Sequence, residues 1–223
     1  SKKNVFWEAL IIAIFIFALG LVSGFYIEQL RTEKTNDLFY QSEVSLYDSF
    51  ALARVIDNPD VSCEVLKNVN IQFADKIYYE AKTLEKFDSS NKITDSVKLV
   101  HRKYDLLRTL LWMDLIESKK KCKDNINTVV YLYTYNTEDL EVRSKQIVWS
   151  RILNDLKQKQ GGNLILIPIA TDQNISSLDY LINQYGINKF PSVMVNERKV
   201  FYEPSNLEDL EKYLSNSSVK KFK

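Results

Sequence analysis

The longest apolar stretch of the chain runs from Ala9 to Ile27 and contains no charged residue. As a helix it would measure about 28 Å, close to the roughly 30 Å of a bilayer's hydrocarbon core. Trp7 and Tyr26 lie near its ends, where aromatic rings prefer the membrane interface. The pattern predicts an N-terminal transmembrane anchor over residues 1–28. The alternative is a cleaved signal peptide with Ala18-Leu19-Gly20 as its cleavage site, but the apolar run continues past that point.

Charged residues beside this span bear on its orientation in the membrane, and small residues within it bear on helix packing. Basic residues precede it and Arg31 and Lys34 follow it, so the charge difference favours a cytoplasmic N-terminus and an extracytoplasmic remainder only slightly. Gly20 and Gly24 form a G-x-x-x-G pattern, and small residues let membrane helices approach closely. They are candidates for helix packing and homo-oligomerisation. The alternative is a chance spacing.

Three amphipathic patterns follow between residues 29 and 124 and predict an antiparallel helical bundle, or stalk. The first pattern ends at Asn58-Pro59-Asp60, the second begins near Val61 and the third near Thr94. Apolar residues recur at spacings of three and four in the second and third patterns: Leu66, Val69, Phe73, Ile77, Ala81 and Leu84, then Val97, Val100, Tyr104, Leu107, Leu111 and Leu115. The bundle core is also expected to hold Tyr78, Tyr79, Trp112 and Met113.

The chain has two cysteines, and the lengths of the predicted helices bring them together. Cys63 opens the second bundle helix and Cys122 closes the third, and the two helices are nearly equal in length. A disulfide between them would stabilise the fold by about 4 kcal/mol in the chain-entropy model and fits an oxidising compartment. The alternative is an exchange-active pair, with the lysine run 119–121 favouring a thiolate at Cys122. The helix dipole explains those lysines more simply.

From residue 127 the pattern changes to the order β-α-β-α-β-β-α. Strands are expected at 128–134, 163–170, 192–195 and 200–202, and helices at 138–159, 177–185 and 207–214. The nearly continuous apolar run 163–170 is typical of a parallel strand beneath helices, and Pro168 favours an edge position. Leu140, Ile147, Ile152 and Leu156 are expected to face the core. The pattern therefore predicts a domain of mixed class with four strands.

Two short segments carry a family resemblance. Tyr185-Gly186-Ile187, followed by Phe190-Pro191-Ser192, resembles the helix end, turn and cis-proline loop of the thioredoxin-like superfamily, over residues 127–216. The whole layout also resembles small membrane-anchored thioredoxin-like proteins of archaea. The resemblance implies a mixed sheet with helices on both of its faces and a cis bond before Pro191. It also implies that Phe190, Pro191 and Ser192 either contact a peptide or retain only inherited geometry.

The redox motif of that superfamily is missing. Where its Cys-x-x-Cys follows the first strand, this chain has Asn136, Thr137, Glu138, Asp139 and Leu140. Thr137 is interpreted as a helix N-cap, with the two acidic residues complementing the helix dipole. Disulfide exchange at this place is excluded because no cysteine is present.

Composition bears on whether the protein binds nucleic acid, a metal or a cofactor, and on whether it is glycosylated. Charged residues make up 26 % of the chain and the net charge is +1, with no clustered basic segment of the kind that binds nucleic acid. His101 is the single histidine and is expected in solvent, so neither a metal site nor a cofactor is predicted. Asn174 and Asn216 fit the N-glycosylation acceptor pattern, the second just before a polar tail at 217–223.

These observations lead to a functional hypothesis. The chain is expected to be a membrane-anchored, extracytoplasmic, redox-inactive thioredoxin-like protein that acts as a binding or scaffolding subunit of a membrane or envelope complex. The alternative is a thiol–disulfide oxidoreductase or isomerase that uses Cys63 and Cys122. A third hypothesis is a structural envelope protein without a client.

Overall fold

The computed structural model describes residues 2–56, 60–88, 95–122 and 126–214. The helices are α1 (Lys2–Ile56), α2 (Cys63–Asp88), α3 (Asp95–Lys121), α4 (Leu140–Gln160), the 3-10 turn η1 (Gly161–Asn163), α5 (Ser176–Gln184) and α6 (Leu207–Glu211). The strands are β1 (Asn127–Tyr133), β2 (Leu164–Ala170), β3 (Ser192–Val195) and β4 (Lys199–Phe201). The chain divides into two compact units, Ser1–Val44 and Ser45–Lys223.

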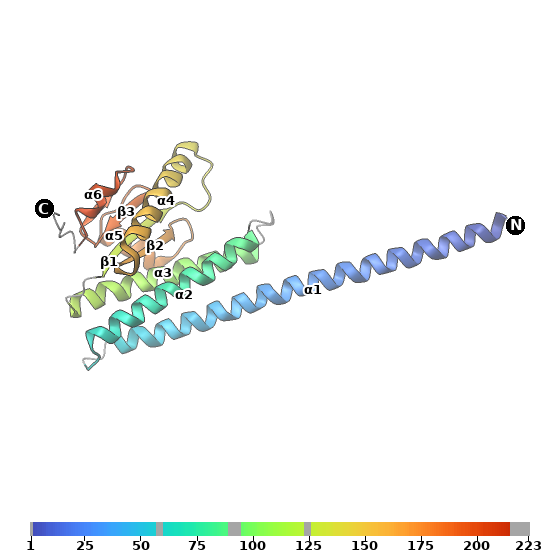
Figure 1. Cartoon of the computed structure of the whole chain (residues 1–223), viewed down its shortest axis with the longest axis horizontal. Helices are drawn as coiled ribbons and strands as arrows, with labels where there is room; N and C mark the ends of the chain where they lie inside the picture. Colours follow the sequence, from blue (N-terminus) through green and yellow to red (C-terminus); the bar gives the residue numbers. More distant parts are fainter. Residues whose placement is uncertain (1, 57–59, 89–94, 123–125, 215–223) are drawn as a thin grey trace. The chain divides into compact units, whose positions relative to one another are not determined.

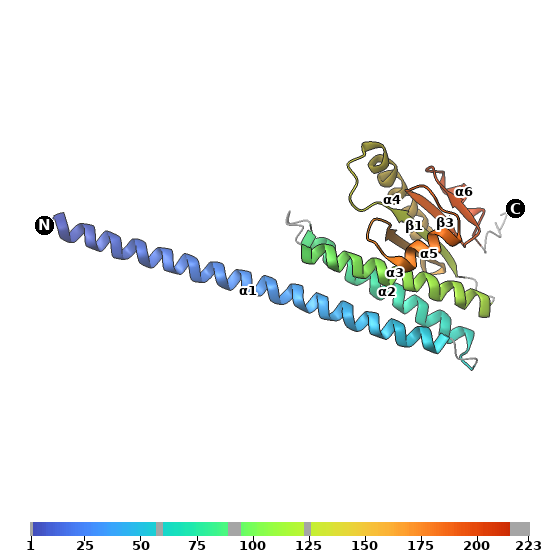
Figure 2. The same ribbon diagram turned by 180° about the vertical axis from the view of Figure 1, so that it is seen from behind.

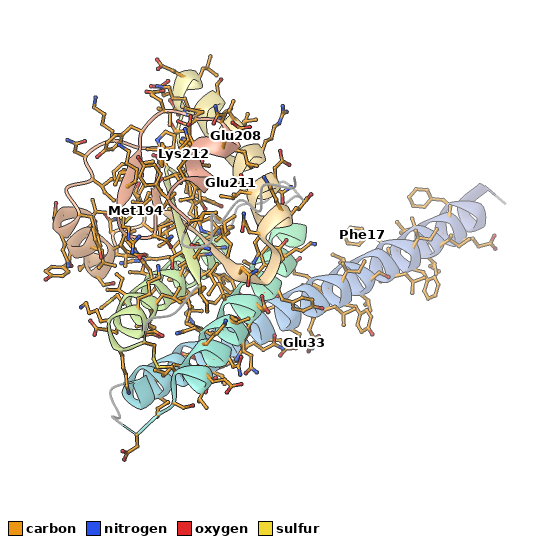
Figure 3. All side chains as sticks on the ribbon, turned by 60° about the vertical axis from the view of Figure 1, so that its left-hand side comes forward. Phe17, Glu33, Met194, Glu208, Glu211 and Lys212 are labelled. Atoms are coloured by element: carbon orange, nitrogen blue, oxygen red, sulfur yellow. A yellow bond between two sulfur atoms is a disulfide. The ribbon has the colours of Figure 1, made fainter. Side chains whose placement is uncertain are left out.

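The N-terminal apolar segment lies within a single long helix. Phe6–Leu30 has a mean hydropathy of 2.6 and is long enough to span a membrane, although a signal sequence would meet the same criterion. Its large side chains point outward, as Figure 3 shows for Phe17. The polar residues that follow continue the helix, since Thr32 Oγ1 donates to the Glu28 carbonyl at 3.0 Å and no proline or glycine interrupts the turn. The apolar segment therefore fits a single-pass anchor.

α2 and α3 form an antiparallel hairpin whose open end is closed by the two cysteines (Figure 1). One face of α2 is buried: Leu66, Asn70, Phe73, Ile77 and Ala81. α2 packs against α3. Burial raises the pKa of Tyr104 on α3, and the Glu80 carboxylate on α2 raises it further, so these two side chains lie close together across the hairpin. The predicted stripe of α2 is thus confirmed at Leu66, Phe73, Ile77 and Ala81, whereas Asn70 rather than Val69 takes the buried position. The side chain of Leu84 lies outside the described residues.

α3 is buried on two sides, which the sequence did not indicate. The expected apolar residues Val100, Tyr104, Leu107, Leu111 and Leu115 are buried, and the side chain of Val97 lies outside the described residues. Polar residues of α3 are buried as well: Asp105, Thr109, Asp114 and Ser118. α3 packs against the sheet domain as well as against α2 (Figure 2). A helix that contacts neighbours on two sides buries more than one stripe, and its second face can be polar if hydrogen bonds satisfy it.

The prediction of an aromatic bundle core was wrong for three of its four residues. Trp112 is fully buried, but Tyr78 and Tyr79 are 68 % and 74 % exposed and Met113 is also exposed. In α2 the two tyrosines follow Ile77, which occupies the buried position, so both fall on the outer side of the helix.

The four strands form one sheet in the order β2-β1-β3-β4, with β1 and β2 parallel and the other pairs antiparallel. β2 lies at an edge, as Pro168 predicted. α4 and α6 cover one face, where they bury a cluster: Val129, Tyr131, Trp149, Leu153, Leu156, Leu164, Val193, Val195, Leu210 and Leu214. The other face lies toward α5 and α3 (Figures 1 and 2). Helices on both faces of a mixed sheet were expected from the sequence.

The buried face of α4 differs from the predicted one. Leu140 is 73 % exposed and Ile147 is half-exposed, so these two predictions were wrong. The prediction is confirmed for Leu156, which is buried, and Ile152 packs partly buried against the same core. Trp149 and Leu153, which were not predicted, are buried beside Leu156. Trp149, Leu153 and Leu156 are spaced by four and three residues, so they lie on one face of α4. The large indole of Trp149 favours burial of this face against the sheet. The prediction placed Leu140 and Ile147 in the core because it followed the aliphatic residues and overlooked the tryptophan.

Candidate functional site

The loop after β1, to which the family resemblance assigns a redox motif, lies at the carboxyl end of that strand. The Asp172 carboxylate, from the loop after β2, accepts two hydrogen bonds there: from Tyr135 N to Oδ1 and from Asn136 N to Oδ2, both 2.9 Å. Thr134 is bound in the same way by Gln146 of α4, which accepts from its amide at 2.9 Å and donates to its carbonyl at 3.2 Å. The loop is therefore held by side chains of its own chain.

The first turn of α4 is capped internally as well. Asp139 is the N-cap, and its Oδ1 accepts from Glu141 N at 2.8 Å and Val142 N at 3.3 Å. Thr137 lies two residues earlier, and its hydroxyl accepts from Asp139 N at 3.2 Å. The prediction of Thr137 as N-cap was thus two residues early. A carboxylate is the stronger acceptor for helix amides, and Glu138 stays exposed beside it.

The predicted proline loop lies beside β1. The Phe190–Pro191 peptide bond is cis, and Ser192 pairs with Leu132 in the antiparallel register. Pro191 and Ser192 are buried and Phe190 is half-buried. The buried Ser192 hydroxyl has no hydrogen-bond partner within the described residues. Of the three predicted contact residues, Phe190 therefore offers the most accessible surface.

α3 contributes a set of contacts to this edge of the sheet that sequence reasoning missed. Arg102 Nη2 donates to the Asn174 carbonyl at 2.9 Å, and the His101 ring lies 4.7 Å from the Tyr135 ring. The Asp105 carboxylate accepts from Ala170 N at 3.3 Å. His101 is consequently half-buried against a neighbouring loop, contrary to the expected solvent position. A helical pattern alone does not reveal such contacts, because they join residues more than 30 positions apart.

A second set of contacts holds the other half of α3 to the turn between β3 and β4. Lys119 Nζ pairs with Glu197 Oε2 at 2.7 Å, and Trp112 Nε1 donates to Glu197 Oε1 at 3.2 Å. The Trp112 indole also stacks on Tyr185, with 5.6 Å between ring centroids. Burial lowers the pKa of Lys119, and the Glu197 carboxylate opposes that change. α3 is therefore fastened to the sheet domain at two separate places.

Asn196 connects the same turn to three further segments. Its Oδ1 accepts from Thr128 N at 2.9 Å and from Lys119 Nζ at 3.3 Å. Its Nδ2 donates to Asn127 Oδ1 at 2.9 Å and to the Tyr213 carbonyl at 2.8 Å. Asn196 and Glu197 both adopt positive φ, at 51° and 53°. Asn tolerates this backbone region better than most residues, so its side chain and its conformation both suit the position.

The two cysteines are bonded, with the sulfurs 2.02 Å apart and 59 positions separating them in sequence. The helix lengths had predicted this proximity. Cys63 is exposed and Cys122 is 2 % exposed. Neither cysteine lies in the loop that the family resemblance assigns to redox chemistry, so the disulfide and that loop are separate features.

The remaining predicted residues are only partly described. Gly20 and Gly24 face open space on α1, with no atom within 4 Å of where a Cβ would stand. Asn174 is exposed in the turn before α5, with φ of 54°. Asn216 lies outside the described residues. These placements are compatible with the predicted roles but do not test them.

Comparison with known proteins identifies no family. No family model matches the chain, and no curated protein matches it. A solved structure described as "Structure of a malarial protein" is similar over 40 % of this chain and 99 % of that chain, at 17 % identity and a TM-score of 0.31. A likeness at this level supports no conclusion about fold or function.

Proposed function

We propose that the chain is a membrane-anchored, redox-inactive protein of thioredoxin-like type that binds a protein partner as a scaffolding subunit. The strand order β2-β1-β3-β4, the parallel β1–β2 pair and the cis Phe190–Pro191 bond support the thioredoxin-like assignment. The apolar segment Phe6–Leu30 supports the anchor. A bonded cysteine pair supports an extracytoplasmic position for the domains after the anchor, because disulfides persist in oxidising compartments.

The main support for redox inactivity is that side chains of the same chain already bind the backbone amides of the loop after β1. In an exchange enzyme this position presents a thiolate at a helix N-terminus. Here Asp172 accepts from the amides of Tyr135 and Asn136, and Asp139 accepts from the first helix amides. The backbone donors that would stabilise a thiolate or an incoming anion are thereby occupied. What remains accessible at this edge is side-chain surface, including the half-buried Phe190, which suits binding without chemistry.

One observation favours the alternative, a thiol–disulfide oxidoreductase that uses Cys63 and Cys122. Cys63 is exposed, so a thiolate could attack its sulfur from solvent. Against this, Cys122 is buried and the bond closes a long loop, which is typical of a structural disulfide.

An insulin-reduction assay distinguishes the two functions. The full chain in detergent micelles is compared with its Cys63→Ala/Cys122→Ala variant, using a dithiol such as dithiothreitol as the electron source. We expect no catalysed reduction by either protein. In a separate urea unfolding experiment without dithiothreitol, so that the bond stays intact, the free energy of unfolding should be about 4 kcal/mol lower in the variant. Catalysis by the unsubstituted chain that is lost in the variant would establish the oxidoreductase instead.

A photo-crosslinking experiment tests the binding function directly. The photoreactive residue p-benzoylphenylalanine replaces Phe190 in one variant and the exposed Asp155 of α4 in a matched control. Irradiation of native membranes is expected to give a discrete higher-mass adduct for the Phe190 variant and none for the control. Equal labelling at both positions, or none at either, contradicts a binding surface at Phe190.

A further inference from the structure

Two polar side chains are buried inside the hairpin of α2 and α3 without satisfying their hydrogen bonds. Asn70 of α2 is 0 % exposed and Ser118 of α3 is 2 % exposed. The Oδ1 and Nδ2 atoms of Asn70 and the Oγ atom of Ser118 have no hydrogen-bond partner within the described residues. Buried polar groups are nearly always hydrogen-bonded, because losing water without gaining a new partner is unfavourable. These three atoms therefore mark a candidate binding site.

The disulfide fixes how the two helices of the hairpin lie against each other. It joins Cys63, at the start of α2, to Cys122, directly after α3. With a rise of about 1.5 Å per residue, Glu80 lies about 26 Å and Tyr104 about 27 Å along the hairpin from that bond. Beyond the effect of burial, the Glu80 carboxylate raises the pKa of Tyr104, so residues at equal distance from the disulfide face each other.

Asn70 and Ser118 lie one helical turn away from the disulfide along these facing sides. Leu66 packs against Cys122 in the core beside the bond. Asn70 follows Leu66 by four residues and Ser118 precedes Cys122 by four, so each shares a helix face with that neighbour. By helical rise, Ser118 is about 6 Å, Asn70 about 10 Å and Asp114 about 12 Å from the disulfide. Asn70 therefore faces α3 at a height between Ser118 and Asp114.

The chemistry of these groups selects a small, neutral ligand that both donates and accepts hydrogen bonds. The Asn70 amide needs an acceptor for Nδ2 and a donor for Oδ1, and the Ser118 hydroxyl can act in either way. A cation would face the Nδ2 donor, and an anion would face the carboxylate of Asp114, which is 5 % exposed. Ser118 is smaller than Leu111 and Leu115 on the same face of α3, which leaves space at this height. Water, with a volume of about 30 Å³, fits both the chemistry and the size.

We propose that the α2–α3 hairpin binds structural water between Asn70 and Ser118, and that this water bridges the two helices. Water accepts from Asn70 Nδ2, donates to Asn70 Oδ1 and reaches Ser118 Oγ with its remaining hydrogen-bonding capacity. Buried waters with about three such partners are integral parts of folded proteins. The site lies inside the hairpin and does not depend on the binding function proposed for the surface at Phe190.

Relaxation dispersion of water oxygen-17 nuclei tests the site in the full chain in detergent micelles. The measurement detects water molecules that stay inside a protein much longer than water stays at its surface. The unsubstituted protein is compared with Asn70→Leu, which removes both polar atoms at similar volume. We expect the dispersion amplitude to fall by the contribution of about one or two water molecules. The matched control is Asn68→Leu on the exposed side of the same helix, which should leave the amplitude unchanged.

A second measurement keeps the proposal refutable even if Asn70→Leu fails to fold. In the unsubstituted protein, the Asn70 Nδ2 protons should give cross-peaks with water that differ in sign between NOE and ROE spectra. This difference indicates contact with long-lived water and not proton exchange. The cross-peaks should persist in Ser118→Ala, which lacks the hydroxyl proton that could relay the signal. An unchanged dispersion amplitude in Asn70→Leu, or Asn70 cross-peaks with Ser118 and none with water, would overturn the proposal, because the two side chains would then bind each other directly.

Discussion

The turn residue Asn196 provides the sharpest test of how α3 and the sheet are held together. Substitution by alanine removes the hydrogen bonds of its side chain with Thr128, Lys119, Asn127 and Tyr213. The Thr128 amide belongs to a residue with 0 % exposure, so the loss of its acceptor leaves a buried donor unpaired. That single group costs about 1–3 kcal/mol, and each of the other bonds contributes about 0.5–1.5 kcal/mol.

Asn196→Ala also forces a residue with a Cβ to keep a φ of 51° without the local hydrogen bonding that helps asparagine there. The left-handed conformation costs alanine about 1 kcal/mol relative to glycine. We therefore expect Asn196→Ala to lower the free energy of unfolding by about 3.5 kcal/mol or more. Asn196→Gly removes the same bonds without the backbone cost, so it should be about 1 kcal/mol less damaging than the alanine variant.

Urea unfolding of the full chain in micelles, followed by tryptophan fluorescence, measures these differences because Trp112 and Trp149 are both buried in the folded state. Arg198→Ala, an exposed position in the same turn, is the control and should change the free energy by less than about 0.5 kcal/mol. Recovery of full stability in Asn196→Gly would refute the reasoning, because it would assign the whole effect to backbone conformation. A loss below about 1 kcal/mol in Asn196→Ala would refute it equally.

Four further substitutions test other contacts. Asp172→Asn removes one of two carboxylate acceptors from the loop after β1, so amide exchange at Asn136 should accelerate about fivefold or more, while unchanged exchange would contradict the clamp. Trp112→Phe deletes the indole donor to Glu197 and should cost about 1–3 kcal/mol by urea unfolding; a neutral result would show that this contact contributes nothing. On α4, Leu153→Ala should cost about 2–5 kcal/mol and Leu140→Ala less than about 0.5 kcal/mol, and the reverse order would mean that the helix buries its other face.

Much of the element order could be predicted because it depends on local patterns. The apolar run within Phe6–Leu30 marks the candidate anchor, and residue spacings identify α2 and α3 to within a few positions. Equal helix lengths were enough to bring Cys63 and Cys122 together. The family resemblance placed β2 at the sheet edge, and Pro168 agreed with it, since an edge strand tolerates a residue that lacks the amide donor.

The candidate site was predictable only in outline. Its position after β1 followed from the missing cysteines, and Phe190 and Pro191 followed from the family resemblance. Asp172 and Gln146 gave no sign in the sequence that they would hold this loop, because each belongs to a different element. The exposed face of α4 was also misjudged, since a helix with aliphatic residues on several sides does not reveal which side meets the sheet.

By itself, then, the sequence determined where helices and strands form, that one segment is apolar enough to cross a membrane, and that the cysteines can pair. Only the tertiary structure decided that α3 has a second, polar buried face, with Asp105 at one end and Lys119 at the other. The reason is physical. The spacing of apolar residues shows which face of a helix is apolar and packs in a core. It does not show the hydrogen bonds to Ala170 and Glu197, because these form only when segments distant in sequence fold against α3.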